Sequence, residues 1–402
     1  MRVSTSWIYA SGSADLSRKQ AEMLRTQQQL SSGKRLLSPA DDPIAASAAL
    51  GLEQARAQND QYTRNQGFAQ DTLRLAESTL ANAGTVLQEV RELAIAAGND
   101  TLGAADRASL AVAVRGKLQA LLGLANTRDG ADGYLFAGYQ ENAQPFTATA
   151  SGVAYQGDQG SRALQVSATR QLAVSASGAD VFEGARAGNG QFTVAAGAGN
   201  AGAATADPGR VVNPAALTGH SYRVVFSAGG AGTTYDIVDT TTAATIVSGA
   251  AYTSGAAISF DGMQLTVSGA PADGDTFTLA PSARQSVFGT LDDLAALLEG
   301  SAAGTTDQAQ FHTALGTAIA SLDQAHDHLL AVRTGIGSRL NELDALASQG
   351  ASTGELLQSE SSRLVDLDYA EAASRLAQQQ ISLQAAQQSY LRVTGLSLFN
   401  FL

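Results

Sequence analysis

The glycine run at residues 197–202 has the spacing of a nucleotide-binding loop, G-x-G-x-x-G. In such loops the glycines let a phosphate approach the N-terminus of the helix that follows. A strand-like segment at residues 191–194 precedes the run, but Pro208 and Gly209 come too soon after it for a helix to begin. A chain with 41 glycines is also expected to contain such a match by chance. We therefore predict no dinucleotide site here and no cofactor.

Histidines and carboxylates are the candidates for a metal site. His326 and His328 are two positions apart, so they point to different faces of a helix and cannot bind one ion together. Asp323 and Asp327 are their acidic neighbours in the sequence. The acidic pairs in residues 129–133 and 273–275 lack the spaced oxygen ligands of a calcium loop and are typical of turns. We predict no metal site.

A catalytic centre cannot be assembled from the sequence either. The chain has no cysteine, and no G-x-S-x-G motif marks a nucleophilic serine. None of its histidines stands where a serine or carboxylate partner can be argued. The absence of cysteine also excludes disulfides and thiolate metal sites. We therefore predict that the protein is not an enzyme.

Composition excludes several other classes of function. The 402 residues are 44% hydrophobic, which is enough for real cores and for two or three domains. The net charge of −12 argues against nucleic-acid binding, which needs clustered basic residues. No run of 18 or more apolar residues predicts a membrane span, and the first 20 residues lack the apolar core of a cleaved secretion signal.

Proline marks where long helices can run, because it interrupts them. Residues 44–144 and 282–402 contain none. In the first gap leucines repeat every seven residues from Leu73 to Leu87, and a second helix is predicted through residues 110–121. In the last gap the same spacing holds at Leu315, Leu322, Leu329, Ile336 and Leu343. A sustained seven-residue repeat is typical of helices that supercoil together.

The two ends of the chain carry narrow stripes of the same kind. The N-terminal stripe is Leu16, Met23, Leu30 and Leu37, and the C-terminal one is Tyr369, Leu376, Leu383 and Tyr390, followed by Val393. Residues 1–40 contain six basic and two acidic residues, a balance of +4, and residues 365–402 contain two basic and three acidic ones, a balance of −1. These features predict ends that pair with each other or with other copies. The alternative is two ordinary amphipathic helices packed on one globular core.

Each stripe is next to a predicted joint: the N-terminal stripe ends at one, and the C-terminal stripe begins after the other. The prolines of residues 38–43 cannot lie inside one straight helix with the N-terminal stripe. At the other end, the heptad phase breaks between Leu364 and Tyr369. The sequence therefore predicts a joint at residues 366–368 between two helical segments.

The middle of the chain alternates apolar and small polar residues in short runs between glycines, aspartates and prolines, which predicts strands. The predicted strands are residues 134–136, 153–155, 164–167, 221–226, 234–238, 245–247, 258–260, 264–267 and 276–279. Spacings of about 8 to 12 residues suggest a small antiparallel sandwich or barrel. Residues 184–206 are rich in glycine and alanine and are predicted to be a mobile linker.

The residues around the first joint carry a resemblance to a known family. The run from Gln29 to Pro43, with Ser32, Gly33, Lys34, Arg35, Asp41, Asp42 and Pro43, resembles the N-terminal signature of bacterial flagellins and the hook-associated axial proteins. Residues 365–372 resemble the C-terminal joint of that family, and residues 87–96 resemble its first core helix. The resemblance covers roughly residues 1–180 and 285–402.

Two further motifs are similar to the hook–filament junction branch of the family. The first is the segment 133–138, with Tyr134, Leu135, Phe136 and Gly138, which is similar to that branch's turn from a helix into a hairpin. The second is the tail, with Leu398 and Phe399. This resemblance implies a structural subunit of the flagellum that joins hook to filament and templates flagellin polymerisation. The alternative within the family is a flagellin filament subunit.

The resemblance also implies a fold, partners and a location. The expected fold is α+β: an elongated coiled-coil bundle of the N- and C-terminal segments, an inserted β-hairpin region and a small antiparallel β domain. Residues 1–43 and 365–402 would be assembly arms, 44–180 and 282–364 a helical rod, and 181–281 a variable β-rich domain. Implied partners are other copies in a junction ring, the proximal hook-associated junction protein, flagellin and a cytoplasmic export chaperone. The implied location is extracellular, in the flagellum, after type III export without a cleaved signal.

The predicted assembly interface joins the two stripes and the tail. It comprises Leu16, Met23, Leu30, Leu37, Tyr369, Leu376, Leu383, Tyr390, Val393, Leu398 and Phe399.

Overall fold

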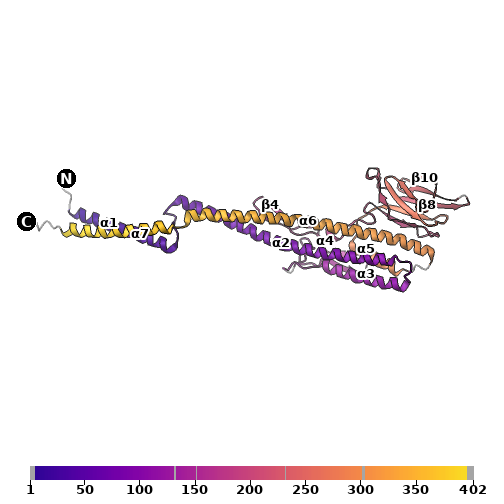
Figure 1. Ribbon diagram of the computed structural model, residues 1–402, viewed down its shortest axis with the longest axis horizontal. Helices are drawn as coiled ribbons and strands as arrows, with labels where there is room; N and C mark the ends of the chain where they lie inside the picture. Colours follow the sequence, from indigo (N-terminus) through magenta and orange to yellow (C-terminus); the bar gives the residue numbers. More distant parts are fainter. Residues whose placement is uncertain (1–4, 131–132, 151, 231, 301–303, 396–402) are drawn as a thin grey trace, which may run out of the picture. The chain divides into compact units, whose positions relative to one another are not determined.

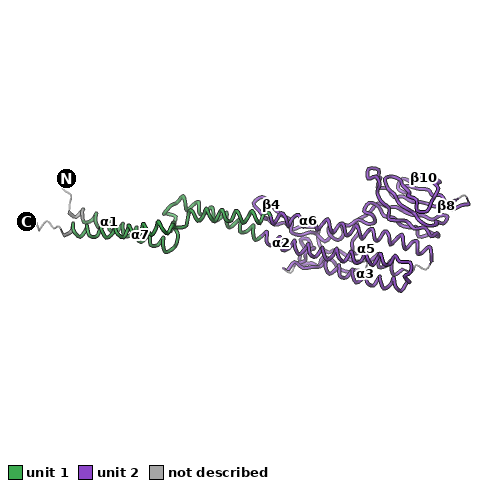
Figure 2. The backbone as a smooth tube through the Cα atoms, in the orientation of Figure 1, with its two compact units in different colours: residues 1–64, 345–402 green, residues 65–344 purple. Residues whose placement is uncertain are grey.

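A computed structural model describes residues 5–130, 133–150, 152–230, 232–300 and 304–395. Leu398 and Phe399 of the predicted interface lie outside the described residues. The chain divides into two compact units, residues 1–64 with 345–402 (unit 1) and residues 65–344 (unit 2), as coloured in Figure 2. Unit 1 joins the two ends of the chain, and unit 2 contains the middle.

Long helices fill the proline-free parts of the sequence, as predicted (Figure 1). They are α1 (Thr5–Ser32), α2 (Pro43–Ala97), α3 (Ala104–Ala125), α5 (Val287–Glu299), α6 (Thr305–Val365) and α7 (Tyr369–Gly395), with the short helix α4 (Gly178–Phe182) and a 3₁₀ turn at Pro214–Ala216. Helix α2 begins at Pro43, where proline is favoured because the first helical N–H has no partner within the helix. The predicted helix through residues 110–121 is α3.

The seven-residue repeats of unit 2 form its helical core. Leu73, Leu80 and Leu87 of α2 are at most 1% exposed, and the five predicted members in α6 are at most 3% exposed. Val114, Leu118 and Leu121 of α3 are also buried, and α3 packs on α5. Burial of each such side chain contributes about 1.5 to 3 kcal/mol, so the repeats identify the residues that hold these helices together.

Helix α3 is the one described helix that is long and apolar enough to cross a membrane. Its length and composition are the only grounds for this, and core helices of globular proteins can be equally long and apolar. Its buried side packs on α5.

Two short hairpins lie between α3 and α4 in the sequence. They pair β1 (Phe146–Thr149) with β2 (Gly152–Tyr155) and β3 (Ala163–Ser167) with β4 (Arg170–Ala173). The predicted strand at residues 134–136 is wrong, because this segment forms a turn in which the backbone N–H of Leu135 donates to Thr127 O at 2.9 Å. Leu135 and Phe136 are buried there, so burial explains their apolar character.

The β domain of unit 2 consists of two antiparallel sheets around one core. One sheet has the order β10-β9-β8-β13-β5, and the other the order β11-β12-β6 with β7 also paired to β12. Side chains from both sheets, including Phe192, Tyr222, Phe260, Leu265 and Phe277, form a single buried cluster. The strands are β5 (Phe192–Ala196), β6 (Thr205–Ala206), β7 (Arg210–Val211), β8 (Tyr222–Gly229), β9 (Gly232–Asp239), β10 (Ala244–Ala251), β11 (Ala257–Phe260), β12 (Met263–Ser268) and β13 (Thr276–Pro281).

The predicted mobile linker at residues 184–206 is wrong. It contains β5, which pairs with β13, and β6, which pairs with β12. Phe192 and Val194 are at most 2% exposed, so two large side chains anchor a segment whose composition suggested flexibility. The glycine run inside it is a turn, because both Asp275 carboxylate oxygens accept backbone N–H groups from residues 201 and 202.

Candidate assembly site

The family-like motif builds the end of one helix and the start of the next. Gly33 ends α1: its backbone N–H donates to Gln29 O at 2.8 Å, and its φ of +70° is one that glycine adopts without strain. Asp42 begins α2, because its Oδ1 accepts the backbone N–H of Ala45 at 3.0 Å. Asp368 begins α7 in the same way, through the N–H groups of Ala370 and Glu371. Helix α6 ends at Val365, so four helix ends meet at this joint of unit 1.

Backbone hydrogen bonds tie the two joint segments together. The N–H of Arg35 donates to Val365 O at 2.8 Å, and the N–H of Leu367 donates to Gly33 O at 3.0 Å. Between them, Lys34 and Asp366 form an antiparallel bridge. The N-terminal motif and the C-terminal motif are thus two halves of one structure, which sequence alone did not show.

The Arg35 side chain caps α6. Its Nη2 and Nε donate to Leu364 O at 2.8 and 3.2 Å, so a cation lies at the helix C-terminus, where backbone carbonyls carry partial negative charge. Its Nη1 also reaches Asp42 Oδ2 at 3.5 Å. Arg35 therefore connects the C-terminal end of α6 to the N-terminal end of α2.

Asp41 organises the loop between α1 and α2. Its Oδ2 accepts the N–H groups of Leu37 and Ser38 at 3.0 and 3.1 Å, and Arg25 of α1 pairs with its Oδ1. The hydrogen bond from Leu37 is the main reason that the pKa of Asp41 is lowered. The N–H of Ala45 is the main reason that the pKa of Asp42 is lowered. Both carboxylates are therefore held ionised by the loop and helix end that they bind.

The two predicted stripes face each other within one chain. Lys19 contacts Ser382, and a Cβ added at Gly12 or Gly33 would collide with Tyr390 or Tyr369. Helices α1 and α7 therefore run antiparallel, side by side in Figure 1. Leu383 is 8% exposed, and five further stripe residues are half-buried: Leu16, Met23, Leu30, Leu376 and Tyr390. We call these six residues the seam.

Three predicted stripe residues do not join the seam. Leu37 lies in the loop after α1, because Gly33 ends the helix four residues earlier, and it is 37% exposed. Tyr369 at the start of α7 and Val393 near its end are 58% and 45% exposed. The opposite charges of the two ends do not produce direct pairs: among the described residues, no ion pair joins α1 to α7, and Lys19 Nζ instead donates to Ser382 Oγ at 2.7 Å.

Unit 1 also exposes apolar residues that the stripes did not predict. Of the 18 large hydrophobic side chains that are exposed among the described residues, 11 belong to unit 1. Those outside the predicted interface are Trp7, Tyr9, Leu24, Ile44, Leu50, Leu356, Ile381 and Leu391. The sequence signal that could have identified them is the presence of large apolar residues outside the heptad positions, such as Leu24 beside Met23. Their exposure suits a surface that other molecules cover.

The hairpin-turn motif lies in unit 2 and has a structural role. Phe136 packs edge-on against Phe182 with ring centroids 5.4 Å apart, and the Arg128 guanidinium lies over Tyr134 at 5.2 Å. Gly138 has φ +74°, and a Cβ there would collide with Asp158. These residues fix the chain reversal after α3 and take no part in the joint.

Nothing at the joint or elsewhere in the described part of the chain forms a metal site. No group of three His, Cys, Asp or Glu side chains is close enough to hold an ion there. His326 contacts Gln88, whereas His328 Nε2 contacts Asp180 O at 2.7 Å, so the two rings have different neighbours. A groove at the joint is lined by ten ionisable side chains, six acidic and four arginines. Both peptide groups and charged side chains are hydrogen-bonded within the joint itself.

Comparison with known proteins gives the same family at both ends. The bacterial flagellin N-terminal helical region matches residues 3–141, and the flagellin C-terminal helical region matches residues 319–402. The D2-like domain of flagellar hook-associated protein 1 matches residues 195–281, within the β domain.

Individual relatives cover three quarters or more of the chain. Flagellar hook-associated protein 3 of Escherichia coli is 29% identical over 399 residues, which is 99% of each chain. The crystal structure of the flagellar junction protein FlgL from Legionella pneumophila is 30% identical with a TM-score of 0.73, and the match covers 79% of this chain and all of that one. The structure of FlgL from Xanthomonas campestris is 29% identical with a TM-score of 0.71, covering 76% and 98%.

Proposed function

Because the chain belongs to the flagellin family, and within it to the hook-associated proteins of the hook–filament junction, we propose that it is a structural subunit of the bacterial flagellum that joins hook to filament. The observation that carries this is the joint: both family motifs, more than 300 residues apart in sequence, bind each other through paired backbone hydrogen bonds. A subunit that must present its two ends as one surface needs such a connection. Full-length similarity to hook-associated proteins supports the junction role over a filament role.

The proposed assembly mechanism has two layers. The seam holds α1 to α7 within a subunit, which leaves Leu24, Ile381 and other apolar residues of unit 1 exposed. Packing of these residues against neighbouring subunits would remove them from water, at about 25 cal/mol per Å² of apolar surface. In this proposal the predicted interface residues serve mainly as the internal support, and the exposed residues make the contacts. Leu398 and Phe399 extend the same proposal beyond the described residues.

The proposed partners follow from a place between hook and filament. They are other copies of the chain in a junction ring, the proximal hook-associated junction protein on one side and flagellin on the other, with flagellin polymerisation templated on the ring. A cytoplasmic export chaperone and type III export without a cleaved signal complete the proposal. Residues 1–43 and 365–402 would act as the assembly arms, 44–180 and 282–364 as the supporting rod, and 181–281 as the variable domain. We propose no catalytic role.

Electron microscopy of a deletion strain tests the junction role against the alternative, a flagellin filament subunit. Loss of the junction subunit should leave hooks without filaments and flagellin in the medium, and the intact gene should restore filaments. Hooks that carry a cap but release no flagellin would instead identify the chain as the filament subunit. Normal filaments in the deletion strain would refute both roles.

A further inference from the structure

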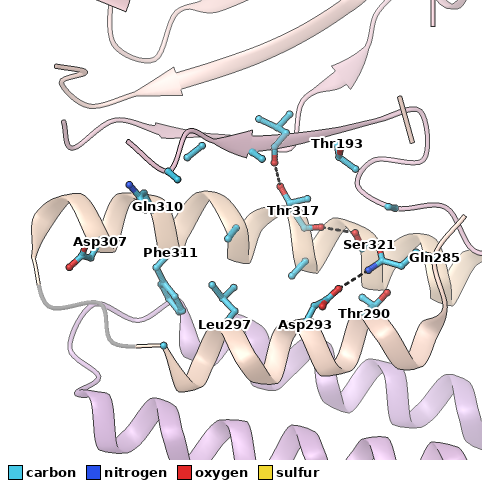
Figure 3. A pocket seen from close by; sticks show the side chains of 18 residues that line it. Thr193, Gln285, Thr290, Asp293, Leu297, Asp307, Gln310, Phe311, Thr317 and Ser321 are labelled. Carbon is cyan, nitrogen blue, oxygen red and sulfur yellow. Dashed lines mark hydrogen bonds between the residues drawn. The ribbon is translucent and has the colours of Figure 1, made fainter. Parts of the chain in front are cut away.

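A groove in unit 2 lies between strand β5, helix α5 and helix α6 (Figure 3). Its volume is about 630 Å³. Sites for small molecules usually measure about 300 to 1,000 Å³, with mostly apolar walls and a few polar groups. The joint and the seam use none of its residues, so the proposed function does not account for it.

Small side chains leave this groove open. Six alanines and a glycine line it: Ala187, Ala195, Ala196, Ala198, Gly300, Ala314 and Ala318. Larger apolar side chains, Leu297 of α5 and Phe311 of α6, point toward each other in Figure 3 and wall one part of the groove. The Phe311 ring is held in place by the Arg107 guanidinium, 5.2 Å from its centroid. The fixed apolar side chains beside this open volume can therefore contact the apolar part of a bound molecule.

Strand β5 cannot accept another strand at this groove, because helix α6 already lies along it. Thr317 Oγ1 of α6 donates to Val194 O at 2.7 Å, and Ser321 Oγ accepts the N–H of Gly188 at 2.8 Å. Helix α6 therefore already occupies the outer edge of β5, where an added strand would form its hydrogen bonds. The volume and lining of the groove suit a small molecule.

The charge of the lining favours a cation. Its 18 residues include two carboxylates, Asp293 and Asp307, and no lysine, arginine or histidine. Gln285 Nε2 donates to Asp293 Oδ2 at 3.1 Å, and among the described residues no donor is recorded for Asp293 Oδ1. Burial, with a smaller contribution from Asp292, raises the pKa of Asp293, which means that its negative charge is poorly compensated. A bound cation would supply the missing compensation.

We propose that this groove binds a small organic cation, an ammonium group carried on an apolar body of roughly six carbons. Asp293 and Leu297 are four residues apart on one face of α5, about 6 Å along the helix. An ammonium group on Asp293 Oδ1 therefore places a ring of that size against Leu297 and Phe311. Ala314 and Ala318 of α6 leave the space for it.

Cyclohexylamine and its neutral analogue cyclohexanol test this with the full chain by saturation-transfer NMR titration. We expect saturable amine binding, at least about tenfold tighter than the alcohol, or about 1.4 kcal/mol. Both probes can donate a hydrogen bond to the Asp293 carboxylate, but only the ammonium group also carries a positive charge. In Asp293→Asn the two affinities should become equal within about threefold, because the variant keeps the shape and removes the charge.

Two matched pairs of variants locate the site. Ala318→Leu fills the groove and should abolish binding of both probes, whereas Ala331→Leu, at an exposed position of α6, should not change it. Asp327→Asn removes an exposed acid outside the groove and should leave the amine affinity unchanged. Circular dichroism checks that each variant is folded. No saturable amine binding up to about 10 mM, or binding that Asp293→Asn leaves intact, would overturn the proposal.

Discussion

Replacing Leu383 with aspartate tests whether the seam supports assembly. Leu383 is the most deeply buried seam residue, at 8% exposed, and lies on α7 against α1. If the seam holds the two ends as one surface, the variant should separate α1 from α7 and prevent incorporation into the flagellum. The β domain should stay folded, because its buried cluster contains no residue of α1 or α7.

The size of the effect follows from burial. Removing a buried leucine side chain costs about 2 to 5 kcal/mol, and a carboxylate in the same place adds the cost of removing a charge from water. Lys19, which donates to the neighbouring Ser382, could pair with the new carboxylate and reduce that second cost. Leu383→Ala, which adds no charge, is therefore the companion variant. The other seam side chains are only half-buried, so they contribute little further stabilisation to the packing of α1 on α7.

The assay combines motility and electron microscopy of complemented deletion strains with melting curves of the purified chains. We expect Leu383→Asp to lose helical signal at low temperature, to leave the melting of the β domain within about 2 °C of the wild type, and to give hooks without filaments.

Two nearby variants separate internal support from external contact. Ile381→Asp changes a residue that is 68% exposed, so it should keep the helical signal and still prevent incorporation if Ile381 contacts a neighbour. Gln384→Asp, at an exposed position of the same helix, should behave as the wild type. Filaments of normal number and length on Leu383→Asp would refute the role of the seam.

Three further predictions concern single groups. Arg35→Ala should speed amide exchange at residues 365–368 by an amount equivalent to about 1 to 3 kcal/mol, because Leu364 O loses a charged donor; Arg35→Lys should recover only part of this, and unchanged exchange would contradict the capping role. Gly33→Ala should lower the free energy of unfolding of unit 1 by at least about 1 to 2 kcal/mol, because φ is +70°. Its Cβ would also lie 2.8 Å from Tyr369 Oη, so adding Tyr369→Phe should recover part of the loss in urea unfolding, and no recovery would exclude that contact. For Asp239, burial would raise the pKa, but hydrogen bonds from Thr242, His220 and Thr241 outweigh it and lower the pKa to about 2. Its stabilising contribution is therefore complete above the ordinary pKa of 3.8 and is lost as pH falls toward about 2. Melting of the β domain between pH about 5 and 2 should show this loss and Asp239→Asn should flatten it, whereas equal pH profiles would contradict it.

Local patterns were enough to predict most elements. The proline-free gaps and seven-residue repeats predicted the long helices, because helix formation and burial of one face depend on residues three to seven positions apart. Alternation predicted most strands of the β domain for the same reason, with a period of two. The joint residues were recognisable because glycine at a helix end and aspartate at a helix start have local causes.

Contacts across long sequence separations decided the rest. Residues 191–194 already had a strand-like pattern, but the sequence did not reveal their partner. The strand at residues 192–196 pairs with β13, about 85 residues later, and shares its core. Residues 134–136 have the composition of a strand but form a turn, because their apolar side chains are needed in the core.

The sequence by itself determined that both ends carry narrow apolar stripes and a joint. It left open whether the stripes face each other or other molecules, since a heptad repeat specifies an apolar face and not its partner. In the tertiary structure α1 packs on α7, as the hydrogen bond between Lys19 and Ser382 shows, and most stripe residues are buried or half-buried between the two helices. That pairing leaves Leu24 and Ile381 outside, so the surface proposed for assembly exists only because the two ends are already joined.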